Sequence, residues 1–201
     1  MLNQSQNQPL KKLYLKEPNK VFGVGINDIK GVTSTKLYTT WHSMIRRCYS
    51  GVYRKRKPSD TLCYVCDNWL RLSSFKVWFD ENYVEGLELD KDILVEDNRL
   101  YSSDTCCFIP KTLNSSLISS SSDDRLPTGV VYNKKLNKYI AQISLLSLGD
   151  VKCKHLLCSN SVDECHQEYL KHKGLLILEL LEESKSIIKP EVYIRIRDKY
   201  T

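Results

Sequence analysis

The sequence predicts an α+β protein. An N-terminal helical region leads into a central stretch with short strands, and a three-stranded antiparallel sheet packed on one helix follows. Residues 37–49 carry apolar side chains at helical spacing. Residues 126–145 are typical of two strands joined by a turn at residues 134–137. Ser161 and Glu164 form a capping box, which predicts that a helix begins there.

The composition favours a folded protein outside the membrane. The 201 residues are 41% hydrophobic and 27% charged, which is ordinary for a globular chain with a core. No apolar run approaches the roughly 20 residues that cross a bilayer, and the N-terminus lacks a signal-peptide core. We therefore expect a cytosolic protein without membrane contact. Its 8 cysteines are then expected to be reduced thiols or metal ligands.

Charge is unevenly distributed along the chain. The net charge is +6, the residues up to 57 are strongly basic, and residues 80–104 are acidic. A basic arm beside an acidic centre suits a protein that holds phosphates at one place and a cation at another. The densest basic run, together with a nearby arginine pair, is predicted to contact DNA phosphates without reading bases. These residues are Arg46, Arg47, Arg54, Lys55, Arg56 and Lys57.

The N-terminal region is predicted to be helical. Residues 1–20 are polar and basic, and we expect them to be mobile. The Gly-x-Gly of residues 23–25 predicts a tight turn, because a third glycine and a following Lys-Ser/Thr are missing. Ser73 or Ser74 is expected to cap a second amphipathic helix. Cys63 and Cys66 have the spacing of a zinc half-site, which Cys106 and Cys107 could complete. Adjacent cysteines are poor joint ligands of one tetrahedral ion, so strand thiols are favoured over zinc.

Residues 87–114 carry the candidate chemistry. Asp90, Lys91 and Asp92 follow apolar residues that predict a short strand, and such a charge cluster is costly unless a partner uses it. Oxygen ligands from Asp90, Asp92 and Asn114 would suit a hard cation such as Mg²⁺. The sequence therefore predicts a magnesium site here, and it leaves open the alternative that the acidic cluster is simply solvated.

The order of these features resembles the ββα-metal (HNH) nuclease motif, and residues 22–110 resemble bacteriophage HNH endonuclease-like or homing-endonuclease-like proteins. The resemblance implies a degenerate HNH-like domain over residues 21–114. Residues 90–92 lie where the family has Asp-His, and residues 104–106 lie where it has Glu-Asn-Leu. Its implied catalytic positions are Asp90, Lys91, Thr105 and Asn114.

Two of these positions depart from the family pattern. Lys91 stands where the family has the histidine that activates water, and a lysine of ordinary pKa is protonated at neutral pH. Thr105 lacks the amide that would orient that histidine. We therefore expect the nuclease chemistry to be lost or altered.

The C-terminal part is expected to be a separate DNA-binding unit. Residues 115–125 form a serine-rich segment that is typical of a linker. A third strand is expected near residues 151–158, and residues from about 127 to 173 resemble the ethylene-response-factor (Apetala-like) DNA-binding domain, which implies a domain over residues 126–185. That resemblance implies a sheet lying in the major groove of double-stranded DNA. The residues that would face DNA are Asn133, Lys134, Lys135, Lys138 and Gln142. Residues 186–201 alternate in a way that predicts an edge strand.

Three functions remain open on the sequence. The leading hypothesis is a phage-encoded DNA-binding protein of the host cytoplasm, derived from an HNH homing endonuclease. The alternative is an active Mg²⁺-dependent endonuclease that nicks DNA. A third hypothesis is a repurposed regulator or counter-defence factor that binds a host or phage protein through the acidic residues 80–104. The sequence leaves the oligomeric state and the DNA site unassigned.

Overall fold

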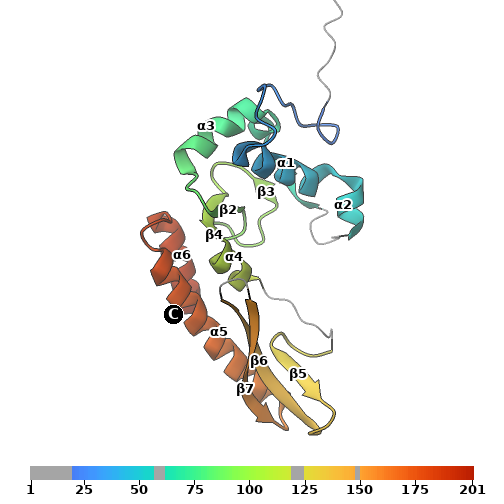
Figure 1. Ribbon diagram of the computed structural model, residues 1–201, viewed down its shortest axis with the longest axis vertical. Coiled ribbons are helices and arrows are strands. Elements are labelled where there is room, and N and C mark those ends of the chain that lie inside the picture. The colour runs from blue at the N-terminus through green and yellow to red at the C-terminus, as the bar shows by residue number, and fades with distance from the viewer. Residues whose placement is uncertain (1–19, 57–61, 119–124, 148–149) are drawn as a thin grey trace, which may run out of the picture.

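The structure is a computed structural model that describes residues 20–56, 62–118, 125–147 and 150–201. Over these residues it is an α+β protein, as the sequence predicts, with a three-stranded antiparallel sheet packed against a long helix. Figure 1 shows the N-terminal helices at one end and the sheet at the other, with helices between them. None of the helices in the described ranges combines the length and the apolar character needed to cross a bilayer.

Helix α1 (Lys36–Tyr49) is the centre of the N-terminal core. Its buried side chains are Leu37, Trp41, Met44, Ile45 and Cys48. This stripe confirms the helix that the sequence predicts, and Tyr38 packs against it as a partly buried residue. The Trp41 indole N–H donates to the carbonyl of Trp69 at 2.7 Å, so the deepest polar group of the core is satisfied. A short helix α2 (Gly51–Arg56) follows directly.

Helix α3 (Leu72–Asn82) begins earlier than the sequence suggests, because its cap comes from elsewhere in the chain. Neither Ser73 nor Ser74 is the N-cap residue; Arg71 holds that position and makes no side-chain cap. Instead the Asp28 carboxylate accepts the Ser73 backbone N–H at 3.0 Å and the Ser73 hydroxyl at 2.6 Å. Although burial opposes it, hydrogen bonds from Ser73 and Arg71 hold the pKa of Asp28 below its usual value.

The central stretch forms two antiparallel strands followed by a helix. Strand β2 (Leu87–Asp90) pairs with β4 (Cys107–Pro110), and α4 (Lys111–Leu117) follows at once. The loop between β2 and β4 contains β3 (Leu100–Tyr101), which pairs in parallel with β1 (Tyr64–Val65). Residues 115–117 therefore belong to a helix, which corrects the expected start of the linker; residues 119–124 lie outside the described residues.

The sheet at the other end consists of β5 (Val130–Asn133), β6 (Lys138–Ser147) and β7 (Asp150–Ser159) in that order. Its first turn lies at residues 134–137, as predicted.

Helix α5 (Val162–Ser184) begins at the predicted cap. The Ser161 side chain accepts the Glu164 backbone N–H at 3.2 Å. The Glu164 carboxylate accepts from the Ser159 hydroxyl, so the capping box is only half formed. Farther along α5 the buried positions include Ile177 and Leu181.

The C-terminal tail is a helix, and the predicted edge strand is wrong. Helix α6 covers Pro190–Tyr200 and runs back beside α5 (Figure 1). Alternation of Val192, Ile194 and Ile196 suits a strand, but Val192 and Ile196 are also one helical turn apart. Those two are buried while Ile194 is 47% exposed, so packing selects the helical period.

A second core, which we call the C-terminal core, packs the C-terminal helices on the central stretch. It brings residues of β4 and α4 together with residues of α5, α6 and the loop between those helices. Its members are Cys107, Ile109, Leu113, Ile177, Leu181, Ile188, Val192 and Ile196. The first half of α5 packs on the sheet through Cys165, and its second half packs on the central stretch. One helix therefore connects both parts.

Ile177→Ala tests this connection. Ile177 is fully buried, so the truncation should lower the free energy of unfolding by about 2–5 kcal/mol in urea titration. Leu175→Ala is the matched control on the same helix. Leu175 is 59% exposed, and its change should stay within about 0.5 kcal/mol. Equal destabilisation of the two variants would contradict this packing.

Candidate nucleic-acid interface and acidic cavity

Asp90 ends strand β2 and turns the chain. Its Oδ1 accepts the backbone N–H of Asp92 at 2.7 Å and that of Ile93 at 3.1 Å, while no hydrogen bond of the described residues uses Oδ2. Burial raises the pKa of this carboxyl above its usual value, and the neighbouring Asp92 carboxylate adds to the rise. A carboxylate in this environment gains more than a solvated one from a nearby cation.

The Lys91 side chain is engaged by its own loop. Its ammonium donates to the carbonyl of Asn98 at 2.7 Å and pairs with the Asp92 carboxylate. The side chain is only 14% exposed. Both contacts use the amine as a donor to groups of its own loop. The contacts of Lys91 close the loop between β2 and β3.

Asn98 closes the same loop from its other end, and the sequence did not predict this role. Its side-chain amide donates to the carbonyls of Lys91 and Leu100 at 2.7 and 2.6 Å, and its Oδ1 accepts the Leu100 N–H at 3.0 Å. The positive φ of Asp97 immediately before it marks a tight turn. An Asp-Asn pair in a polar stretch was the available signal.

Thr105 is likewise occupied by the backbone. Its hydroxyl donates to the carbonyl of Leu100 at 2.7 Å and accepts the N–H of Ser102 at 3.1 Å. It therefore shapes the turn that leads into β4. Among the hydrogen bonds of the described residues, none joins Thr105 to Asp90 or Lys91.

Asp90, Asp92 and Asn114 come together at one cavity of about 700 Å³. We call it the acidic cavity, because Glu96, Glu191 and Asp198 also line it. Helix α6 forms one wall, and the Lys199 ammonium pairs with Glu96 at 2.9 Å across its edge. In the described part of the chain, no group of three or more His, Cys, Asp or Glu residues is arranged to hold a metal. Magnesium needs only one or two carboxylates when water and substrate phosphate complete its shell.

The predicted basic patch divides into different roles. Arg54 turns inward: its guanidinium donates to the Cys48 carbonyl and lies 5.9 Å from the Tyr49 ring centroid. It therefore secures the junction of α1 and α2. Arg46 lies 5.6 Å from the Tyr53 ring centroid, and Lys55 and Arg56 are exposed at the end of α2. Lys57 lies outside the described residues.

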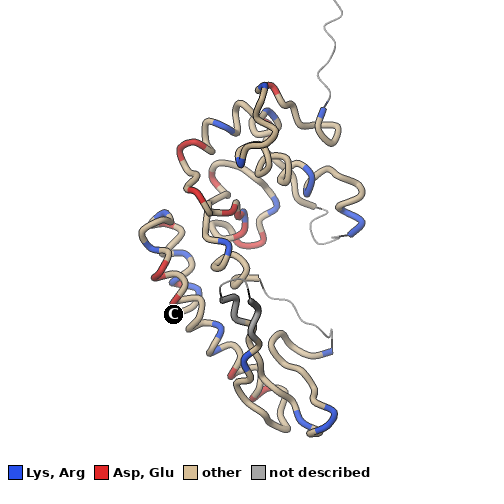
Figure 2. The backbone as a smooth tube through the Cα atoms, in the orientation of Figure 1, with Lys and Arg blue, Asp and Glu red and all other residues tan. Residues whose placement is uncertain are grey.

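The β5–β6 turn carries the most open group of cations. Lys134, Lys135 and Lys138 are exposed, and no ion pair in the described part of the chain involves them. Figure 2 shows basic positions along the β5–β6 turn at the tip of the sheet. We call this group the basic hairpin.

Asn133 and Gln142 border the basic hairpin in different ways. The Asn133 Oδ1 caps the turn by accepting the N–H groups of Lys135 and Leu136 at 3.0 and 3.2 Å. Ala141 faces α5, so the alternating residues Lys138 and Gln142 share the opposite face of β6.

The cysteines are free thiols, and most of them are buried. Cys63 is buried and Cys66 is partly buried, and both flank β1. Burial raises the pKa of Cys48 and of Cys106 to about 12. By contrast Cys153 and Cys158, on β7, are exposed.

Comparison of the chain with protein-family models, with curated proteins and with solved structures finds no match.

Thiol labelling tests the described burial. Only a thiolate attacks a disulfide reagent, and a pKa raised by burial keeps Cys48 and Cys106 protonated at mildly alkaline pH. Cys153 and Cys158 should therefore be modified first, and Cys48 and Cys106 only in denaturant, as mapped by mass spectrometry. The double variant Cys153→Ser, Cys158→Ser should lose the fast phase. Fast labelling of Cys48 in the folded protein would contradict the structure.

Proposed function

We propose that the protein binds double-stranded DNA through the basic hairpin and the sheet face opposite α5. The observation that carries the proposal is the set of three exposed lysines, Lys134, Lys135 and Lys138, at one tip of the sheet. Closely spaced cations without acidic partners neutralise phosphates and release counterions, which is the main source of affinity for a duplex.

Polar side chains beside the basic hairpin could add sequence preference. Gln142 shares the Lys138 face of β6, and an amide can donate to and accept from the edge of adenine. The Asn133 side-chain oxygen already accepts two N–H groups of the turn, so only its amide N–H₂ remains to contact a base. Gln142 is therefore the stronger candidate for base contact.

The end of α2 offers a second place for phosphates. Lys55 and Arg56 are exposed there, whereas Arg54 serves the fold. The basic hairpin and α2 are separated along the long axis of the molecule (Figure 2). A duplex that touched both would run along that axis. In this proposal the protein is phage-encoded and acts in the host cytoplasm, as the resemblance to phage HNH-like proteins implies.

Replacing the three hairpin lysines tests the proposal. The variant Lys134→Ala, Lys135→Ala, Lys138→Ala should bind a duplex more weakly in fluorescence anisotropy. The slope of log affinity against log salt, which is negative, should become less steep by about 0.9 for each phosphate that the variant no longer neutralises. A variant with the same change of net charge, Lys30→Ala, Lys76→Ala, Lys185→Ala, should bind nearly as the wild type. Equal effects of the two triple variants would overturn the assignment of the basic hairpin.

The second candidate function is a Mg²⁺-dependent endonuclease, favoured by the meeting of Asp90, Asp92 and Asn114 at the acidic cavity. The strand, loop, strand and helix that carry them follow in the order of the ββα-metal motif. Because Lys91 is held as a donor, a metal-bound hydroxide would have to replace the missing histidine base.

Asp90→Asn separates the two functions. The amide keeps an oxygen that can accept the two turn N–H groups, but it removes the negative charge that a cation requires. Nicking of supercoiled plasmid in Mg²⁺ should disappear while duplex binding remains. The control Asp67→Asn, an exposed carboxylate on the η2 turn (Asp67–Leu70), should cut normally. Cutting retained by Asp90→Asn would eliminate this metal site, and a wild type that binds but never cuts would leave only DNA binding.

A further inference from the structure

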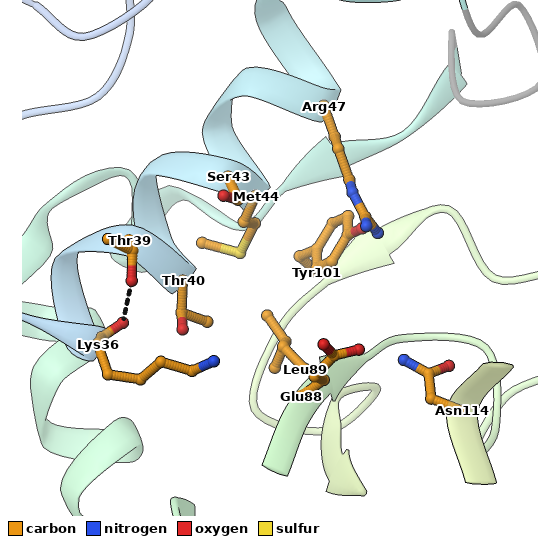
Figure 3. A pocket seen from close by; sticks show the side chains of 10 residues that line it. All are labelled: Lys36, Thr39, Thr40, Ser43, Met44, Arg47, Glu88, Leu89, Tyr101 and Asn114. Carbon is orange, nitrogen blue, oxygen red and sulfur yellow. Dashed lines mark hydrogen bonds between the residues drawn. The ribbon is translucent and has the colours of Figure 1, made fainter. Parts of the chain in front are cut away.

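A second cavity, of about 290 Å³, lies between α1 and the β2–α4 unit (Figure 3). We call it the α1 cavity. Asn114 lines both this cavity and the acidic cavity, so the two hollows meet at one side chain of α4. The two other residues predicted to bind magnesium, Asp90 and Asp92, line only the acidic cavity.

One face of α1 supplies a polar wall. Lys36, Thr40, Ser43 and Arg47 recur at intervals of three or four residues, so they form a stripe along the helix. Lys36 and Arg47 are exposed, and Thr40 and Ser43 are partly buried, so this polar face is reached by solvent. Here Met44 and Leu89 are the apolar lining, and the remaining groups are polar. The stripe therefore lines a space that suits a polar occupant.

The cations of this wall are held in different ways. The Arg47 guanidinium hydrogen-bonds with the hydroxyl of Tyr101, whose ring is only 3% exposed, so a buried group orients it. The Lys36 ammonium points into the cavity in Figure 3, and no hydrogen bond or ion pair of the described residues involves it. Thr40 and Ser43 lie between the two cations and add hydroxyl donors.

The opposite wall has a different chemistry. Glu88 from β2 offers a carboxylate, and Asn114 offers an amide that both donates and accepts. Two cations and two hydroxyls match the oxygens of a phosphate, while a carboxylate matches a hydroxyl or amino donor. A nucleotide carries both kinds of group, with the phosphate and the donors separated by the sugar. The volume of the α1 cavity is at the small end of the range for ligand cavities. The cavity is too small to hold a duplex.

We propose that the α1 cavity binds the phosphate of a single nucleotide unit. Lys36 and Arg47 contact the phosphate, Thr40 and Ser43 donate to its oxygens, and Glu88 accepts from a donor of the sugar or base. The unit is either a free mononucleotide or one nucleotide of a DNA strand. The second source rests on the proposed DNA-binding function, whereas the first is independent of it. A strand held here would border Asn114 from the side opposite the acidic cavity.

Calorimetric titration of the full chain with deoxyadenosine monophosphate, inorganic phosphate and deoxyadenosine tests the proposal. The monophosphate should bind, and the nucleoside should not. Lys36→Ala should weaken binding of the monophosphate about tenfold, as expected when one charge-assisted hydrogen bond is removed. The control Lys30→Ala removes an exposed lysine outside the cavity and should leave the affinity unchanged. Unaltered thermal unfolding will show that each variant is folded.

A parallel titration with a short duplex identifies the source of the phosphate. Duplex affinity that falls in Lys36→Ala, without binding of the monophosphate, assigns the cavity to a DNA strand. Monophosphate binding that survives in the triple hairpin variant, after duplex binding has disappeared, supports the α1 cavity and separates it from the basic hairpin. Equal binding of nucleoside and monophosphate would overturn the proposal. It would also be overturned if Lys36→Ala changed the affinity for no phosphate-bearing probe.

Discussion

The C-terminal core is the constraint on which the arrangement of this protein depends. Leu113 of α4 and Ile177 of α5 are both fully buried, although one belongs to the central stretch and the other to the helix of the sheet. Apolar burial of this kind is the dominant favourable term in folding. Because α5 contributes to the sheet at one end and to this core at the other, a continuous helix sets the distance between the basic hairpin and the central cavities.

Helix α6 has a double role that follows from the same core. Val192 and Ile196 are its buried face, while Glu191, Asp198 and Lys199 line the acidic cavity. The wall opposite Asp90 is thus made by the last helix of the chain. Four of the acidic groups come from the loop after β2 or from α6, namely Asp92, Glu96, Glu191 and Asp198. The negative character of the cavity is therefore a property of the assembled fold.

In the loop after β2, a residue predicted to be catalytic stabilises the loop. Lys91 and Asn98 bond to each other's backbone carbonyls and hold the two ends of the loop together. The Lys91 amine donates within the loop, and one carboxylate oxygen of the neighbouring Asp90 accepts backbone N–H groups of its own turn. What remains for a ligand is the second oxygen of Asp90 together with Asp92 and Asn114. This geometry allows a cation held largely by water and phosphate.

The sequence by itself determined the helices and turns that depend only on residues close together in the chain. The stripe of α1, the turn at residues 134–137 and the Ser161 cap depend on side chains within a few residues, where periodicity and capping chemistry are decisive. Tertiary structure decided the rest. Residues 190–200 fit two periods, and burial against the C-terminal core selected the helix. Asp28 caps α3 from 45 residues away, and Arg54 turns toward the Cys48 carbonyl although its neighbours face solvent. The α1 cavity, too, exists only because α1 and β2 meet in the fold, and no local pattern encodes contacts between segments so distant in the chain.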